Sequence, residues 1–339
     1  MVSKNPLVQK IAEGAPSEDL LRYLLDKQLA FTDEEYLESL VFVLTDPRAA
    51  TRAHELLGLI PQPTKEQYVQ KKEADLKVVD FILQEALDGG YFGTLTLIIQ
   101  NQGYPADFIL RIAAQGRAAV LESMLENQVR LIAFPEIMER MEVNPDCNAY
   151  IRGRIMELRD FYLRPQAAAI PETEVIENLA AIVAEEKKKD PQLDADQVKQ
   201  EALTALQRIN RLGVSDRVRL ALTGNKTERL VLIKDPNKLV QVAVLESPKM
   251  ADDEALIHVR NLSLPGEIIA KIAANRDWTK NYTIILALVE NPKTPVSRAI
   301  SFVKQLHDRD LKRLAKDRNV SPVIRTLTEN LVKQKEKVK

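Results

Sequence analysis

The sequence contains few of the residues on which several classes of fold and site depend. Cys147 is the only cysteine among 339 residues, which excludes an intrachain disulfide and any site held by several cysteines. Glycine (11 residues) and aromatic residues (5%) are scarce, whereas all-β folds need both. No stretch approaches the roughly 18 uninterrupted apolar residues of a membrane span, and Met1–Glu18 lacks the apolar run of a secretory signal. We therefore expect a cytoplasmic, helical protein.

Strong helix formers dominate what remains, and helix signals recur along the chain. Thr32 and Glu35 have the spacing of a capping box, in which each side chain accepts a hydrogen bond from a backbone N–H of the first turn. Behind them, apolar residues at helical spacing predict one buried stripe: Leu37, Leu40, Val41 and Leu44. The alternation in 94–99 is also compatible with a strand, but its flanks favour a helix, which we predict there.

Proline pairs separate apolar stretches of about 8–14 residues, and helices this short need neighbours to cover their apolar faces. We predict that Asp46 caps a helix whose first residue is Pro47. The same pattern recurs at four further positions: Asp235-Pro236, Ser247-Pro248, Asn291-Pro292 and Ser321-Pro322.

The chain also contains internal repeats. Ala243–Lys249 (AVLESPK) recurs as Ala287–Lys293 (ALVENPK), and Ile98–Gln102 (IIQNQ) resembles Met124–Gln128 (MLENQ). The spacings are near multiples of about 14 residues, which is one short helix with its turn. A two-helix unit of about 28 residues and a three-helix unit of about 42 both fit. In either case, stacked units bury a continuous core that no single unit can bury.

Short helices joined by Asn-Pro or Asp-Pro turns resemble HEAT/armadillo-type α-solenoids and the bacterial leucine-rich-repeat-variant proteins. Two longer segments, Glu35–Phe42 and Leu125–Ile132, are similar to those of bacterial helical-repeat proteins. The resemblance covers roughly 30–164 and 214–330, and it implies an all-α, right-handed α-solenoid of short repeats. The chain departs from the leucine-rich-repeat-variant family in one respect. That family can carry a cysteine-ligated iron–sulfur cluster, which Cys147 alone cannot hold.

Composition and charge divide the chain into three predicted parts. Residues 1–164 form an acidic array, 165–213 a helical connector, and 214–339 a basic array. The stretch 1–213 contains 24 Lys and Arg against 34 Asp and Glu, whereas 214–339 contains 24 against 15. Within the connector, a proline-bounded linker at 165–171 precedes predicted helices at 173–188 and 196–212. The alternative to a hinge is one unbroken solenoid with an atypical middle repeat.

Signatures of catalytic and cofactor sites are missing. Gly224–Thr227 (GNKT) lacks the upstream glycine of a phosphate-binding loop, and it favours a turn between helices. His54, His258 and His307 are far apart without metal-ligand spacing, so we expect each at the surface or in helix packing. The sequence therefore predicts no enzyme, no cofactor and no metal site.

Two groups of residues are candidates for contact with a partner. Tyr91 and Phe92 lie in a glycine-rich turn that would present them to a partner, but packing of the two rings against the next helix is the favoured interpretation. The second group is basic: Arg309, Lys312, Arg313 and Lys316. Its spacing allows one positive helix face, whereas the intervening aspartates favour a mixed, salt-bridged surface.

The leading hypothesis is a non-enzymatic scaffold or adaptor that binds another protein. The alternative is a nucleic-acid-binding helical-repeat protein that uses the basic C-terminal half. HEAT-like DNA glycosylases use several tryptophans and a carboxylate, but here Trp278 stands alone beside Asp277. A third possibility is an enzyme whose site has no recognisable motif.

Overall fold

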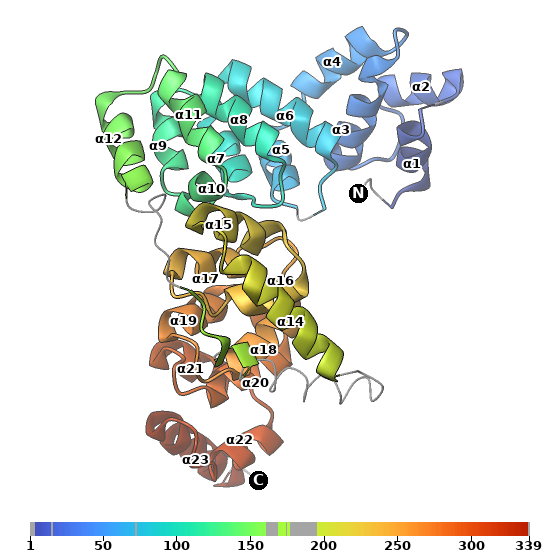
Figure 1. Cartoon of the computed structure of the whole chain (residues 1–339). Coiled ribbons are helices and arrows are strands. Elements are labelled where there is room, and N and C mark those ends of the chain that lie inside the picture. The colour runs from blue at the N-terminus through green and yellow to red at the C-terminus, as the bar shows by residue number, and fades with distance from the viewer. Residues whose placement is uncertain are drawn as a thin grey trace. The chain divides into compact units, whose positions relative to one another are not determined.

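The computed structural model describes residues 4–14, 16–71, 73–160, 169–173, 175–176 and 195–337. Within these ranges every regular element is a helix and no strand is present, so the all-α prediction is confirmed. None of the helices described is long and apolar enough to cross a membrane. The chain divides into two compact units, Met1–Phe161 and Tyr162–Lys339, and each is described by itself (Figure 1).

Unit 1 consists of short helices joined by tight turns. Its helices are α1 (Pro6–Ala12), α2 (Glu18–Leu25), α3 (Asp33–Phe42), η1 (Val43–Thr45), α4 (Ala50–Gly58), α5 (Gln62–Val69), α6 (Leu76–Gly89), α7 (Phe92–Gln100), α8 (Ala106–Gln115), α9 (Ala118–Met124), α10 (Gln128–Ala133), α11 (Pro135–Val143) and α12 (Ala149–Leu158).

Unit 2 follows the same plan. Its helices are α14 (Ala195–Ile209), α15 (Val214–Thr223), α16 (Lys226–Leu232), α17 (Lys238–Leu245), α18 (Asp252–Arg260), α19 (Gly266–Ala274), η3 (Trp278–Lys280), α20 (Tyr282–Glu290), α21 (Val296–Val303), α22 (Asp308–Leu314) and α23 (Pro322–Lys337).

In both units, helices two apart in the chain pack side by side. In unit 1, α5 packs against α3 and α7, and α8 packs against α6; α8 also packs against α11, which is three helices further on. In unit 2, α17 packs against α15 and α19, while α20 packs against α18. Consecutive helices, such as α6 and α7 or α20 and α21, are also in contact. Most of these contacts recur every second helix, which favours the two-helix unit over the three-helix unit, whereas the contact of α8 with α11 departs from this spacing.

Local sequence signals account for several helix boundaries. Thr32 and Glu35 form the predicted capping box at the start of α3, and Leu37 and Leu40 behind it are fully buried. The segment 94–99 lies within α7, as predicted. At Gly224–Thr227, Asn225 and Glu228 form a second capping box at the start of α16, so this segment is the expected turn between helices.

The prediction for the proline pairs was wrong at most positions. Asp46 does not cap a helix at Pro47, because α4 begins only at Ala50. The Asp46 side chain instead accepts the Arg48 N–H at 2.9 Å, in a turn that precedes the helix. Helices α17, α18 and α21 likewise begin two or more residues after their prolines. Only Pro322 is a first helical residue, in α23. A side-chain oxygen that accepts a hydrogen bond from the backbone N–H two residues later stabilises a turn, and the helix then starts after that turn.

The repeated sequence segments have a shared structural role. An asparagine that follows one helix donates its side-chain amide to a carbonyl near the end of a helix two or three helices earlier in the chain. We call four of them the inter-repeat asparagines: Asn101 (to Val69 at 3.4 Å), Asn127 (to Ile99 at 3.0 Å), Asn144 (to Ala113 at 2.9 Å) and Asn291 (to Val259 at 2.6 Å). The last carbonyls of a helix have no partner within that helix, so these amides satisfy them.

Serine and lysine complete the pattern in the AVLESPK and ALVENPK segments. Ser247 takes the place of Asn291 and donates Oγ to the Leu222 carbonyl at 2.8 Å. The lysine at the end of each segment donates Nζ to a further carbonyl, at 2.5 Å for Lys249 and 2.8 Å for Lys293. These hydrogen bonds give a physical reason for the repeats.

The predicted connector at 165–213 is described in part. Its first predicted helix, 173–188, lies largely outside the described residues. The second, predicted at 196–212, is α14, which ends at Ile209 and packs against α16 within unit 2 (Figure 1).

Candidate interaction surfaces

The turn that carries Tyr91 and Phe92 connects α6 to α7. Gly90 adopts a left-handed conformation with φ 67°, which favours glycine, and the Tyr91 N–H then donates to the Ala86 carbonyl at 2.9 Å. The Tyr91 ring lies over Gly89, where a Cβ would come within 2.7 Å of it. Tyr91 and Phe92 are 42% and 48% exposed. The turn therefore holds both rings at the surface, with Tyr91 against its own turn.

Two further turns of unit 1 lie along the same edge. Arg117 follows α8, and its guanidinium is 3.4 Å from the position that a Cβ on Gly90 would take. Asn144 follows α11 and donates to the carbonyls of Ala113 and Gly116, at the end of α8, at 2.9 and 3.0 Å. The turns after α6, α8 and α11 are therefore neighbours.

We call this surface the turn edge and define it by its exposed side chains: Tyr91, Phe92, Arg117, Val143 and Tyr150. Val143 ends α11 and is 76% exposed, and Tyr150 in the first turn of α12 is 62% exposed. Asn148, which caps α12, donates to Glu122 of α9 at 3.2 Å and so keeps this turn beside the preceding repeat. Only Tyr91 and Phe92 were predicted here, because the other three become neighbours through packing.

The basic candidates do not form one positive helix face. Helix α22 ends at Leu314, so Lys316 lies beyond it. Arg313 is paired with Glu290 and lies 3.9 Å from Asp310. Arg309, Lys312 and Lys316 are exposed.

Tyr282 also contacts an aspartate on this surface. Tyr282 donates its hydroxyl to Asp310 at 2.5 Å, and its ring stacks on His307 at 4.4 Å. Together with the Arg313 ion pairs, these contacts make a mixed surface of both charges, as the aspartates in the sequence indicated. Trp278 is buried in η3 and presents no ring to a partner.

Unit 2 buries two complete ion pairs that no sequence motif indicated. Arg217 of α15 donates to Asp235, just after α16, at 2.8 Å, and both side chains are buried. Burial raises the pKa of Asp235, against the opposing effect of its hydrogen bonds and of Arg217. Arg229 of α16 donates to both oxygens of Glu254 of α18, at 2.9 and 2.6 Å. Each pair joins different helices, and the second links successive repeats.

His258 in α18 lies within the same polar interior. It is completely buried, and neither ring nitrogen has a hydrogen-bond partner among the described residues. Burial, together with the charges of Arg229 and Lys234, lowers the pKa of His258 to about 3. A general acid or base works best with a pKa near the operating pH, so this imidazole is a packing residue. His54 and His307 are exposed, which confirms the expectation for all three histidines.

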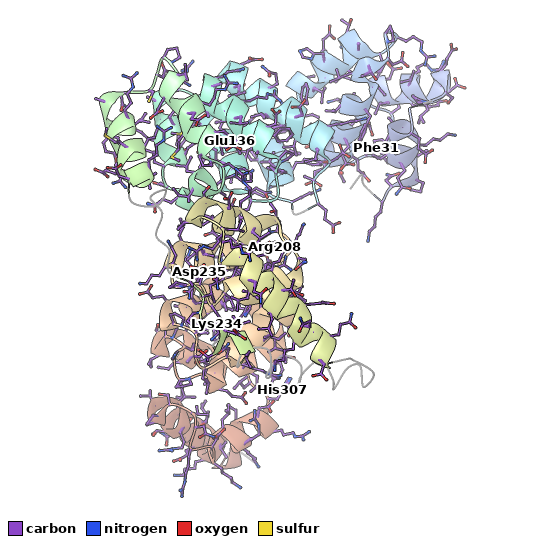
Figure 2. All side chains as sticks on the ribbon, viewed as in Figure 1. Phe31, Glu136, Arg208, Lys234, Asp235 and His307 are labelled. Carbon is purple, nitrogen blue, oxygen red and sulfur yellow. The ribbon has the colours of Figure 1, made fainter. Side chains whose placement is uncertain are left out.

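A shallow groove of about 400 Å³ lies between α14 and α16. The residues that line it include Gln200, Thr204, Asn225 and Thr227. Arg208 bridges the two helices through an ion pair with Glu228 (Figure 2). Within the described ranges, no group of three His, Cys, Asp or Glu side chains is arranged to hold a metal ion.

The comparisons with known proteins add no relative from which a role could be transferred. No family model, no curated protein and no solved structure matches this chain.

Proposed function

We propose that this chain is a non-enzymatic, cytoplasmic scaffold or adaptor that binds another protein. In this proposal each unit is a right-handed α-solenoid of two-helix, HEAT/armadillo-like repeats. The contacts between helices two apart and the inter-repeat asparagines support the repeat. Such arrays present extended surfaces on which partners dock.

The turn edge is the observation that carries the proposal. Tyrosine, phenylalanine and arginine are enriched at protein interfaces, and tyrosine and arginine are frequent hot spots. Here they lie on successive turns, each held by backbone or cross-repeat hydrogen bonds. A rigid row of exposed rings loses little side-chain entropy when a partner covers it.

The test is a comparison of two variants of the tagged, full-length chain in nuclease-treated native lysate. The turn-edge variant is Tyr91→Ser/Phe92→Ser/Val143→Ser. The control variant is Leu262→Ser/Val296→Ser, which removes exposed apolar side chains from unit 2. We expect one co-purifying protein to fall at least tenfold with the turn-edge variant and to stay with the control. If the two variants recover the partner equally well, the binding site lies elsewhere. If the wild-type chain recovers no specific protein, the scaffold proposal is refuted.

The second candidate function is nucleic-acid binding by the basic half, which the exposure of Arg309, Lys312 and Lys316 favours. Phosphate contacts release counterions, so such binding weakens steeply with salt. Gel-shift titrations of the wild type should show weaker binding at about 200 mM salt than at about 50 mM salt. At the lower salt concentration, the variant Arg309→Ser/Lys312→Ser/Lys316→Ser should bind roughly tenfold or more weakly than the wild type. Binding unchanged by the substitutions or by salt would reject this candidate.

A further inference from the structure

A short stretch ahead of α14 packs into unit 2 although it lies outside the helical repeats. We call residues 169–173, 175 and 176 the strap, drawn in green in Figure 1. Ile170 and Val175 are only 2% and 1% exposed. The Val175 N–H donates to the Pro171 carbonyl at 3.4 Å. The strap therefore buries two branched aliphatic side chains five positions apart.

Asn210 holds the strap by its main chain. Its Oδ1 accepts the Ile170 N–H at 2.8 Å, and its Nδ2 donates to the Ile170 carbonyl at 3.2 Å. Asn210 directly follows α14, whose last residue, Ile209, is fully buried. A side-chain amide that bonds both backbone groups of one residue recognises a peptide whatever its side chain. The burial of Ile170 and Val175 then supplies the selectivity for aliphatic side chains.

We infer that the surface of unit 2 at the end of α14 is a peptide-binding site that the strap occupies in the same chain. The partner segment it fits has two branched aliphatic side chains five positions apart, as in the sequence AIPETEVI of residues 169–176. The inference rests on the proposed function as a protein-binding scaffold. It adds a second site, in unit 2, that is separate from the turn edge.

The arrangement makes this site self-inhibited. A segment of the same chain that occupies the site competes with any partner segment, because its own binding is intramolecular. Asn210 is exposed, so water can replace its two hydrogen bonds when the strap leaves. A partner segment must therefore outcompete the strap, or be raised to a comparable local concentration by other contacts that the partner makes with this chain.

The first experiment uses fluorescence polarisation with the labelled peptide AIPETEVI and the full-length chain. Ile170→Ser/Val175→Ser releases the strap and leaves Asn210 in place. We expect this variant to bind the peptide at least tenfold more tightly than the wild type does, and Asn210→Ala in the released variant to weaken binding at least fivefold. The control peptide ASPETESI should bind neither. Equal affinity of wild type and released variant, or no binding by a folded released variant, would overturn the proposal.

A second measurement decides the matter if the released variant fails to fold, as judged by circular dichroism. Hydrogen exchange of the wild-type chain should show protection across 169–176, and millimolar AIPETEVI should accelerate exchange there at least tenfold while ASPETESI does not. The inference would be overturned if residues 169–176 show no protection, or if the peptide leaves their exchange rate unchanged. Neither readout needs a cellular partner, so failure here is distinct from failure of the lysate experiment on the turn edge.

Discussion

The two units bury their arginine side chains in different ways. In unit 1, Arg130 donates to backbone carbonyls, including that of Asn101 at 2.7 Å, and burial lowers the pKa of Arg130 to about 10. In unit 2, Arg229 meets the full charge of Glu254 in the next repeat. Carbonyl dipoles belong to the backbone and survive any substitution, whereas a carboxylate does not. Unit 2 should therefore be the more sensitive to single substitutions and to pH.

The largest effect is expected from Glu254→Ala, which leaves Arg229 buried without its carboxylate. Breaking a buried pair on one side costs about 3–5 kcal/mol. Trp278 is the only tryptophan and is buried in unit 2, so its fluorescence in urea reports the unfolding of that unit.

The matched control is Glu267→Ala, which breaks the exposed pair with Lys238 in the same unit. The loss should stay below about 1 kcal/mol, because exposed ion pairs contribute little. If Glu254→Ala costs no more than this control, the buried pair does not hold the repeats together.

The inter-repeat asparagines should matter equally in both units. Asn144→Ala in unit 1 and Asn291→Ala in unit 2 each leave a buried carbonyl without its donor, which costs about 1–3 kcal/mol. Circular dichroism in urea would measure the first and Trp278 fluorescence the second. A loss confined to one unit would show that the shared amide pattern is not a shared source of stability.

The pH response should separate the units through His258. Its pKa is lowered to about 3 in the folded chain, against about 6.5 in an unfolded one. The unfolded chain therefore takes up a proton first as the pH falls. Below about pH 6.5 the free energy of unfolding of unit 2 should drop by about 1.4 kcal/mol per pH unit.

Trp278 fluorescence in urea at a series of pH values between about 7.5 and about 5 would measure this slope. His258→Leu should remove the His258 contribution and leave the response of the carboxylates. An unchanged slope in that variant would mean that His258 gains its proton without unfolding.

The smallest effect is expected at the turn edge. Tyr91→Ser/Phe92→Ser should change the thermal midpoint of the chain only slightly, since surface substitutions usually stay within about 0.5 kcal/mol each. Calorimetry of the full chain would test this. A large fall in the thermal midpoint would show that the Tyr91 and Phe92 rings stabilise unit 1, which would argue against a role in partner binding.

Local structure followed from the sequence where a signal lies within a few residues. The Thr32–Glu35 capping box and helix α7 belong to this class, because their hydrogen bonds are made inside one helix. The turn residue Gly90 also placed Tyr91 and Phe92 at the surface. The proline pairs misled because Asp46 can cap a turn as readily as a helix, and only the following residues decide where the helix starts.

Contacts between repeats could not be predicted in the same way. Arg229 and Glu254 are 25 residues apart, and nothing in either segment identifies the other as a partner. Charged residues at such positions usually belong to a solvated face, so the buried pairs went unnoticed. For the same reason only Tyr91 and Phe92 of the turn edge were predicted, because Val143 and Tyr150 become their neighbours only through the packing of α8 and α11.

The inter-repeat asparagines bear on how such a chain can change in length. Asn291 donates backwards to Val259, so a pair of helices of this kind carries both a donor for its predecessor and a carbonyl for its successor. An in-frame duplication of one pair would keep every donor matched to an acceptor. Gene rearrangement or protein engineering could therefore lengthen or shorten the array in steps of two helices. Each new junction would form the same amide–carbonyl hydrogen bond as the existing junctions.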